Sequence, residues 1–135
     1  MNPSPRNGTS RRRILVADDE PHIRRVLETL LEASGFEAET VCDGAEALDR
    51  LRDPERVYAL VLTDLMMPER SGLEVLEGIG RMEHRRGLPV VVLTAKGQDA
   101  DRERALALGA SDFLTKPFSP KKLLGRILEI LDGAD

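Results

Sequence analysis

The chain of 135 residues contains one cysteine, no tryptophan, one tyrosine and three phenylalanines. A lone cysteine cannot form an internal disulfide, so a reducing, cytoplasmic setting is expected. Cys42 falls in the apolar run Ala38–Cys42, where a buried, unreactive thiol is the ordinary interpretation. The scarcity of aromatic side chains also argues against a stacking platform for single-stranded nucleic acid.

Long hydrophobic runs are missing as well. No segment approaches the roughly 20 apolar residues that a helix needs to cross a bilayer. The apolar run Ile14–Ala17, just after the N-terminal arginines, is too brief for the hydrophobic part of a signal peptide. The sequence therefore predicts no contact with a membrane.

The charges are divided unevenly along the chain. The formal net charge is −4, yet residues 1–13 carry four arginines and no acidic residue, so the rest is more acidic than the whole. An acidic body is a poor surface for nucleic acid, and direct nucleic-acid binding is not expected. We predict that residues 1–12 form a disordered, arginine-containing tail and that residues 13–135 form one folded domain.

Five short apolar runs, each followed by an amphipathic segment, organise this domain. The runs are Ile14–Ala17, Ala38–Cys42, Ala59–Thr63, Val90–Thr94 and Asp112–Thr115. Three of them contain continuously apolar stretches instead of alternating with polar residues. That pattern is typical of parallel strands covered by helices on both faces.

The intervening segments have helical spacing. Apolar stripes with intervals of three and four residues follow Pro21, Ser71 and Pro120, and shorter helices are expected over Ala45–Leu51 and Asp99–Leu108. The stripe after Ser71 comprises Leu73, Leu76, Ile79 and Met82. Alternating strands and helices predict an α/β fold with a doubly wound parallel sheet and right-handed crossovers, a three-layer sandwich.

Polar residues stand where the strands end. Asp18, Asp19 and Glu20 follow the first run and Asp64 follows the third; Thr94 ends the fourth and Lys116 follows the fifth. Because functional residues of open parallel sheets gather beyond the carboxyl ends of the strands, these side chains are expected to meet.

This set of groups suits phosphoryl transfer. Converging carboxylates need a compensating cation, and an all-oxygen site with room for water favours Mg²⁺. Lys116 offers an ammonium and Thr94 a hydroxyl to phosphate oxygens, which leaves Asp64 as the nucleophile. Each residue alone has an ordinary explanation; Asp18 or Asp19, for example, could cap the helix that begins at Pro21. The joint pattern at four strand ends favours the site.

Four motifs resemble the receiver domains of bacterial response regulators in two-component phosphorelays. They are ILVADDEP, LVLTDLMMPERSGLEVL, VVLTAKG and GASDFLTKPFSP, and the resemblance spans about Arg13 to Leu131. It implies a flavodoxin-like fold whose five strands have the order 2-1-3-4-5, an order that follows from the resemblance and not from the spacing of the residues.

The resemblance also implies roles for individual residues. Asp64 matches the phosphoacceptor, which takes phosphate from the phosphohistidine of a sensor histidine kinase or phosphotransfer protein. Asp18, Asp19 and Asp64, with the backbone carbonyl of Met66, match the Mg²⁺ ligands. The switch residues would be Thr94, Phe113, Lys116 and Pro117, with a cis peptide bond between the last two. For Phe113, plain core packing is the rival interpretation.

The expected output is protein–protein signalling from the face formed by the helix Asp99–Leu108, the fifth strand and the helix from Pro120. A phosphorylation-dependent homodimer through this face is an alternative, although Lys122 replaces the glutamate common in dimerising relatives. The chain is expected to be a switch and not an enzyme. Two other interpretations stay open: a receiver cut from a longer effector-bearing regulator, and a Mg²⁺-dependent aspartyl-phosphate phosphatase, against which Met66 counts.

Two further hypotheses concern neighbours of the site. Met66, beside the path of an attacking water, is expected to slow hydrolysis of the phosphoryl group, and Lys96 places a cation nearby. His22 and His84 are interpreted as surface residues and not as phosphodonors or metal ligands.

Overall fold

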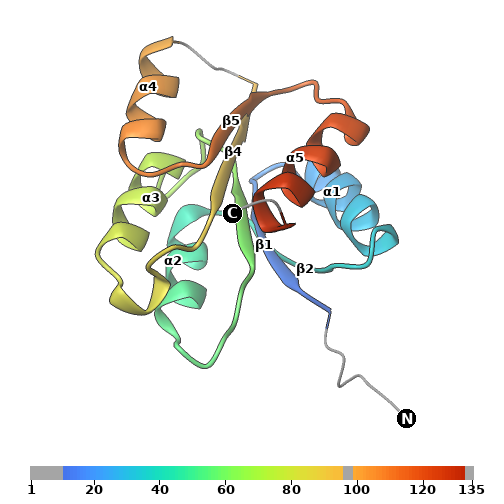
Figure 1. Ribbon diagram of the computed structural model, residues 1–135. Helices are drawn as coiled ribbons and strands as arrows, with labels where there is room; N and C mark the ends of the chain where they lie inside the picture. Colours follow the sequence, from blue (N-terminus) through green and yellow to red (C-terminus); the bar gives the residue numbers. More distant parts are fainter. Residues whose placement is uncertain (1–10, 96–98, 133–135) are drawn as a thin grey trace.

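In the computed structural model, which describes residues 11–95 and 99–132, strands and helices alternate along the chain (Figure 1). The elements are β1 (Arg13–Ala17), α1 (Pro21–Ala33), β2 (Glu37–Val41), α2 (Gly44–Arg52), β3 (Leu60–Thr63), α3 (Gly72–Gly80), the 3₁₀ helix η1 (Glu83–Arg85), β4 (Val90–Thr94), α4 (Asp99–Ala107), β5 (Asp112–Thr115) and α5 (Pro120–Asp132). All strand pairs are parallel and the strand order is β2-β1-β3-β4-β5. The predicted doubly wound α/β fold and its strand order are confirmed.

The sheet separates two hydrophobic clusters. Helices α1 and α5 cover one face and α2, α3 and α4 cover the other (Figure 1). Successive residues of β1 point to opposite faces, so Leu15 packs with α2 and α3 while Ile14 and Val16 pack with α1 and α5. All three are fully buried, which explains why this run is apolar throughout.

Local signals define several helix ends. Ser71 and Glu74 form a reciprocal capping box at the start of α3, and the Ser119 hydroxyl accepts a hydrogen bond from the Lys122 amide at the start of α5. Gly109 follows α4 with a φ of 107°, a left-handed conformation that glycine adopts without strain. These local features define where α3 and α5 begin and where α4 ends.

Two local expectations are wrong. Helix α3 ends at Gly80, so Met82 lies beyond it, at the start of η1, although its side chain still packs against the core cluster. Strand β2 ends at Val41, so Cys42 lies in the turn before α2 and is exposed, not buried. In both cases the apolar run continues past the end of the element.

Most of the predicted tail lies outside the described residues. Of its residues, Arg11 forms an ion pair with Glu32 in α1, and Arg12 forms one with Asp132 at the end of α5. The division of the chain into tail and folded domain stays a prediction. Among the helices of residues 11–95 and 99–132, none is long and apolar enough to cross a membrane.

Candidate phosphorylation site

One ammonium group joins carboxylates from two strand ends. The Nζ atom of Lys116, which follows β5, lies 2.8 Å from Asp18 Oδ2 and 3.0 Å from Asp64 Oδ2. The side chains are almost closed off from solvent, with 7% of Lys116, 2% of Asp18 and 9% of Asp64 exposed. The structure therefore brings together three residues that are far apart in the sequence, as predicted.

Main-chain bonds place these residues at the same edge of the sheet. The amide of Asp64 donates to Ala17 O at 2.9 Å, and the amide of Asp18 donates to Val41 O at 3.2 Å. The amide of Lys116 donates to Thr94 O at 2.8 Å. Sheet-like bonding thus continues one residue past each strand, which holds the functional side chains at the carboxyl edge.

The Asp18 carboxylate and the Lys116 ammonium influence each other's pKa. Burial is the main cause that raises the pKa of Asp18, and the hydrogen bond from Lys116 only partly offsets it. Burial alone lowers the pKa of Lys116, but the hydrogen bonds to Asp18 and Asp64 outweigh it, so that this pKa is raised. Lys116 therefore stays charged inside the pocket, as a phosphate-binding cation must.

The loop after Asp64 is held close to the site. The Met66 amide donates to Asp64 Oδ1 at 3.2 Å, and the Gly72 amide donates to Leu65 O at 2.9 Å. A Cβ atom on Gly72 would overlap the carbonyl oxygen of Asp64, so this contact requires glycine. The Met66 residue is 58% exposed and contributes little to the core.

Carboxylates at this edge form a potential cation site. One ligand oxygen from each of Asp18, Asp19 and Asp64 lies within 4.8 Å of the others. Asp18 and Asp64 are buried whereas Asp19 is exposed, so the cluster opens to solvent on the Asp19 side. An all-oxygen, partly open donor set fits Mg²⁺ better than a softer metal.

Of the predicted switch residues, Thr94, Lys116 and Pro117 lie at the end of their strands, whereas Phe113 lies within β5. Thr94 is buried at the end of β4, and the Lys116–Pro117 peptide bond is cis. Phe113 is 3% exposed and belongs to the hydrophobic cluster on the side of α4. Its burial agrees with the core-packing interpretation and leaves its switch role untested. Lys96 lies outside the described residues.

Glu20 also meets the site, as its place among the strand-end residues predicts, although the sequence assigned it no role there. Its Oε1 atom lies 3.3 Å from Lys116 Nζ, although 62% of the side chain is exposed. Glu20 is also the N-cap residue of α1, where no side-chain cap bond is formed, so neither Asp18 nor Asp19 caps this helix. The run of three acidic residues after β1 was the available signal for this third carboxylate.

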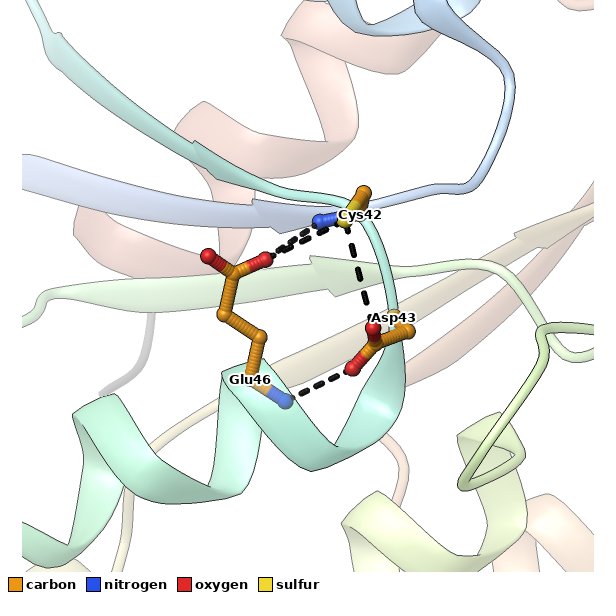
Figure 2. Close-up of side chains that lie close together, drawn as sticks. All are labelled: Cys42, Asp43 and Glu46. Atoms are coloured by element: carbon orange, nitrogen blue, oxygen red, sulfur yellow. Dashed lines mark hydrogen bonds between the residues drawn. The ribbon is translucent and has the colours of Figure 1, made fainter.

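A second group of potential ligands has a structural explanation. Cys42, Asp43 and Glu46 lie at the start of α2, where Asp43 accepts from the Glu46 amide and Glu46 accepts from the Cys42 amide (Figure 2). These bonds cap the helix. The hydrogen bond to Glu46 raises the pKa of the exposed Cys42 thiol, which favours its protonated form.

The two histidines are exposed, as predicted. His22 lies in the first turn of α1, and His84 lies in η1 with its Nε2 atom 2.8 Å from Leu51 O. Neither is among the potential metal-ligand groups of the described residues.

Curated relatives of the chain are transcriptional regulators. It is 44% identical over 119 residues to the transcriptional regulatory protein CpxR homolog of Haemophilus influenzae, covering 88% of this chain and 50% of that protein. It is 42% identical over 120 residues to the phosphate regulon transcriptional regulatory protein PhoB of Escherichia coli, covering 89% and 52%. The chain thus spans about half the length of these relatives.

Solved structures of response regulators have the same fold. The chemotaxis protein CheY4 of Vibrio cholerae superposes with a TM-score of 0.83 at 28% identity, covering 90% of this chain and 100% of that one. The receiver domain of the Francisella response regulator 1452 superposes with a TM-score of 0.81 at 31% identity, covering 92% and 99%.

The family model of the response regulator receiver domain matches residues 14–128. Members of this family are phosphorylation-dependent switches that generally bind Mg²⁺ and interact with histidine kinases and effector domains. This chain belongs to the response regulator receiver domain family.

Proposed function

We propose that Asp64 accepts a phosphoryl group from the phosphohistidine of a sensor histidine kinase or a phosphotransfer protein. The observation that carries this proposal is the position of Lys116 Nζ, 3.0 Å from Asp64 Oδ2 and 2.8 Å from Asp18 Oδ2. A nucleophilic carboxylate held beside a buried cation has the arrangement that phosphoryl transfer needs.

In the transfer, an Asp64 carboxylate oxygen attacks phosphorus while the phosphorus–nitrogen bond of the donor breaks. The donor imidazole leaves with the electron pair and becomes neutral after it takes up a proton. Lys116 neutralises charge on the phosphoryl oxygens, and the Thr94 hydroxyl donates a hydrogen bond to one of them. Bound Mg²⁺, held by Asp18, Asp19, Asp64 and the backbone carbonyl of Met66, would supply further positive charge to these oxygens.

The new phosphoryl group changes the balance of contacts at the strand ends. Its added negative charge favours any arrangement that brings Thr94 and Lys116 closer to it. Because Phe113 and Pro117 flank these residues on β5 and the following loop, we assign them to the switch as well. The change is passed to the face formed by α4, β5 and α5, which then contacts a downstream partner.

The output of the switch is the second part of the proposal. Since the relatives are transcriptional regulators of about twice this length, the domain is a candidate N-terminal receiver of a DNA-binding regulator. The alternative is a receiver that acts alone by protein–protein contact. In either case the receiver itself does not bind nucleic acid, and it performs only its own phosphorylation and slow dephosphorylation.

A phosphorylation-dependent homodimer is the less favoured mode of output. Lys122, which is exposed on α5, replaces the glutamate common in dimerising relatives, and Ala107 and Ser111 lack the acidic groups that would pair across the interface. Sedimentation with and without Mg²⁺ and beryllofluoride, a phosphoryl mimic, distinguishes a monomer from a dimer.

Binding of beryllofluoride also tests the site itself. We expect Mg²⁺-dependent binding by the parent and by the surface variant Asp49→Asn, and loss of binding in Asp64→Asn. Equal binding by Asp64→Asn and the parent would contradict the assignment of Asp64.

A further inference from the structure

Side chains cover part of the outer edge of β5. In the five-stranded sheet, β5 pairs with β4 and lies at one edge. The Lys116 amide points toward β4, because it donates to Thr94 O. Since every second residue of a strand directs its main-chain groups to the same side, the amide and carbonyl of Phe113 point to the outer edge.

Both of these main-chain groups of Phe113 are bound. Its amide donates to Asp112 Oδ1 at 2.8 Å, and its carbonyl accepts from the guanidinium of Arg102 at 3.3 Å. Main-chain groups on the edge of a sheet are otherwise open to water or to another strand. In this structure the side chain of Asp112 on β5 binds the Phe113 amide, and the side chain of Arg102 on α4 binds the Phe113 carbonyl.

The Asp112 carboxylate is also bound by an arginine of α5. Arg126 Nε lies 2.6 Å from Asp112 Oδ2, and the same guanidinium lies 2.7 Å from Glu129 Oε1. The Asp112 side chain is 18% exposed. We call the set formed by Arg102, Asp112, Arg126 and the Phe113 main chain the Phe113 latch. It connects α4 to Phe113 and α5 to the neighbouring Asp112, whose side chain binds the Phe113 amide.

Helix α4 buries few apolar side chains against the described part of the chain. Ala105 is its one buried residue, and Leu106 is 41% exposed, whereas α5 buries Leu123 and Ile127. An element with few buried apolar side chains moves at low cost, so a single polar contact has a large share in fixing its position. The Arg102 bond, at 3.3 Å, is also the longest of the latch.

The connection from the phosphorylation site runs through Thr94. Thr94 ends β4, lies in register with Thr115 of β5, and precedes the start of α4 by five residues. We expect a shift of Thr94 toward a phosphoryl group to displace the beginning of α4 relative to β5. Such a displacement stretches the bond from Arg102 to Phe113.

We propose that the Phe113 latch restrains α4 against β5 and thereby opposes the phosphorylation-dependent change. This inference rests on the proposed function, because it takes phosphorylation of Asp64 as the event that the latch opposes. Arg102 acts as a positioning residue: it touches neither the carboxylates of the site nor the phosphoryl group, and it acts through Phe113 and α4.

The test is the affinity for beryllofluoride in the presence of Mg²⁺. Arg102→Ala is expected to bind about two- to tenfold more tightly than the parent, the range that one net hydrogen bond supports. Arg102→Lys, which keeps a donor, is expected to fall between the two. The matched control is Arg104→Ala, an exposed arginine on the same helix, which should bind as the parent does. An Arg102→Ala variant that binds no more tightly than Arg104→Ala would overturn the inference.

Amide hydrogen exchange tests the latch without any phosphoryl mimic. We expect the amides of α4 to exchange faster in Arg102→Ala than in Arg104→Ala, and the Phe113 amide to exchange faster in Asp112→Ala than in Asp112→Asn, which keeps an acceptor. If the parent binds no beryllofluoride, the proposed function fails, and exchange alone decides the latch. Equal exchange within both pairs would show that there is no latch.

Discussion

Lys116 Nζ lies 3.0 Å from Asp64 Oδ2, although 52 residues separate the two in the sequence. Both side chains are more than nine-tenths buried, so their charges interact with little screening by solvent. The Asp18 carboxylate shares the same ammonium. In the absence of a phosphoryl group, Lys116 therefore neutralises part of the negative charge of Asp18 and Asp64. A bound metal cation would take over part of this role, and a phosphoryl group would be a new partner for the ammonium.

Replacing Lys116 by alanine should increase the affinity for Mg²⁺ and abolish stable phosphorylation. Without the ammonium, the carboxylates of Asp18 and Asp64 repel each other and attract a divalent cation more strongly, by roughly tenfold or more in the dissociation constant. In EDTA the free energy of unfolding should fall by about 1–3 kcal/mol, since two buried carboxylates lose their partner.

Magnesium titration and urea denaturation measure both effects. Lys122→Ala, which removes an exposed lysine from α5, is the control and should change neither quantity appreciably. A Lys116→Ala variant with the Mg²⁺ affinity of the parent would show that this lysine does not compete with the cation.

Gly72→Ala is expected to destabilise the domain and impair the site together. The new Cβ would overlap the Asp64 carbonyl oxygen and lie 3.0 Å from the Leu65 Cα, and backbone atoms cannot move aside cheaply. We expect a loss of about 1–3 kcal/mol in the free energy of unfolding, together with slower phosphorylation.

Gly125→Ala is the matched control for that substitution. Gly125 lies within α5 and has open space where the methyl group of alanine would be added. Alanine there should stabilise the helix by about 0.5–1 kcal/mol. Equal stability of the two alanine variants in thermal and urea unfolding would contradict the clash expected at Gly72.

Met66→Asn is expected to shorten the lifetime of the phosphoryl group. Met66 lies two residues beyond Asp64, donates its amide to that carboxylate and is 58% exposed, and we expect its side chain to obstruct an attacking water. Asparagine offers a hydrogen-bonding group that can orient this water. The half-life of the acylphosphate, followed by loss of phosphate after the donor is removed, should fall several-fold; a variant that keeps the half-life of the parent contradicts the hypothesis.

Tyr58 should make stability dependent on pH in the alkaline range. Burial, and then the hydrogen bond to Glu39 at 2.7 Å, raise the pKa of Tyr58 to about 12 from an ordinary value of 10.0. The raised pKa favours the protonated phenol in the folded state, so this contribution is complete below pH 10 and declines as the pH rises toward 12. By pH 11 the loss is about 1 kcal/mol.

Tyr58→Phe isolates this contribution from the titration of the lysines. The difference in unfolding free energy between parent and variant should be constant up to about pH 9, near the 1 kcal/mol of one hydrogen bond, and should shrink by pH 11. A difference that does not change between pH 9 and 11 would contradict the assigned cause.

The sequence predicted the architecture well because its signals are physical requirements of the fold. Strands buried on both faces must be mostly apolar, as 60–62 and 90–93 are, and a parallel order then brings Asp18, Asp64 and Lys116 to one edge. Apolar runs and the polar residues that follow them can be recognised in the sequence without knowing any distance between atoms.

Features that depend on how long an element continues were harder to predict. The apolar spacing passes the end of β2 at Cys42 and the end of α3 at Met82, and nothing in the periodicity shows where main-chain pairing stops. Contacts that a surface side chain makes with a residue distant in the sequence could not be predicted either. The bond from Arg102 to the Phe113 carbonyl depends on a side-chain conformation that no local pattern fixes.

The most direct test of the central claim is the intact mass of the protein after incubation with acetyl phosphate and Mg²⁺. We predict a gain of one phosphoryl group in the parent and in Asp49→Asn, with no gain in Asp64→Asn and none in the parent when EDTA replaces Mg²⁺. A parent that gains no phosphoryl group, or an Asp64→Asn variant that gains one as readily as the parent, would contradict the claim that Asp64 is the phosphoacceptor.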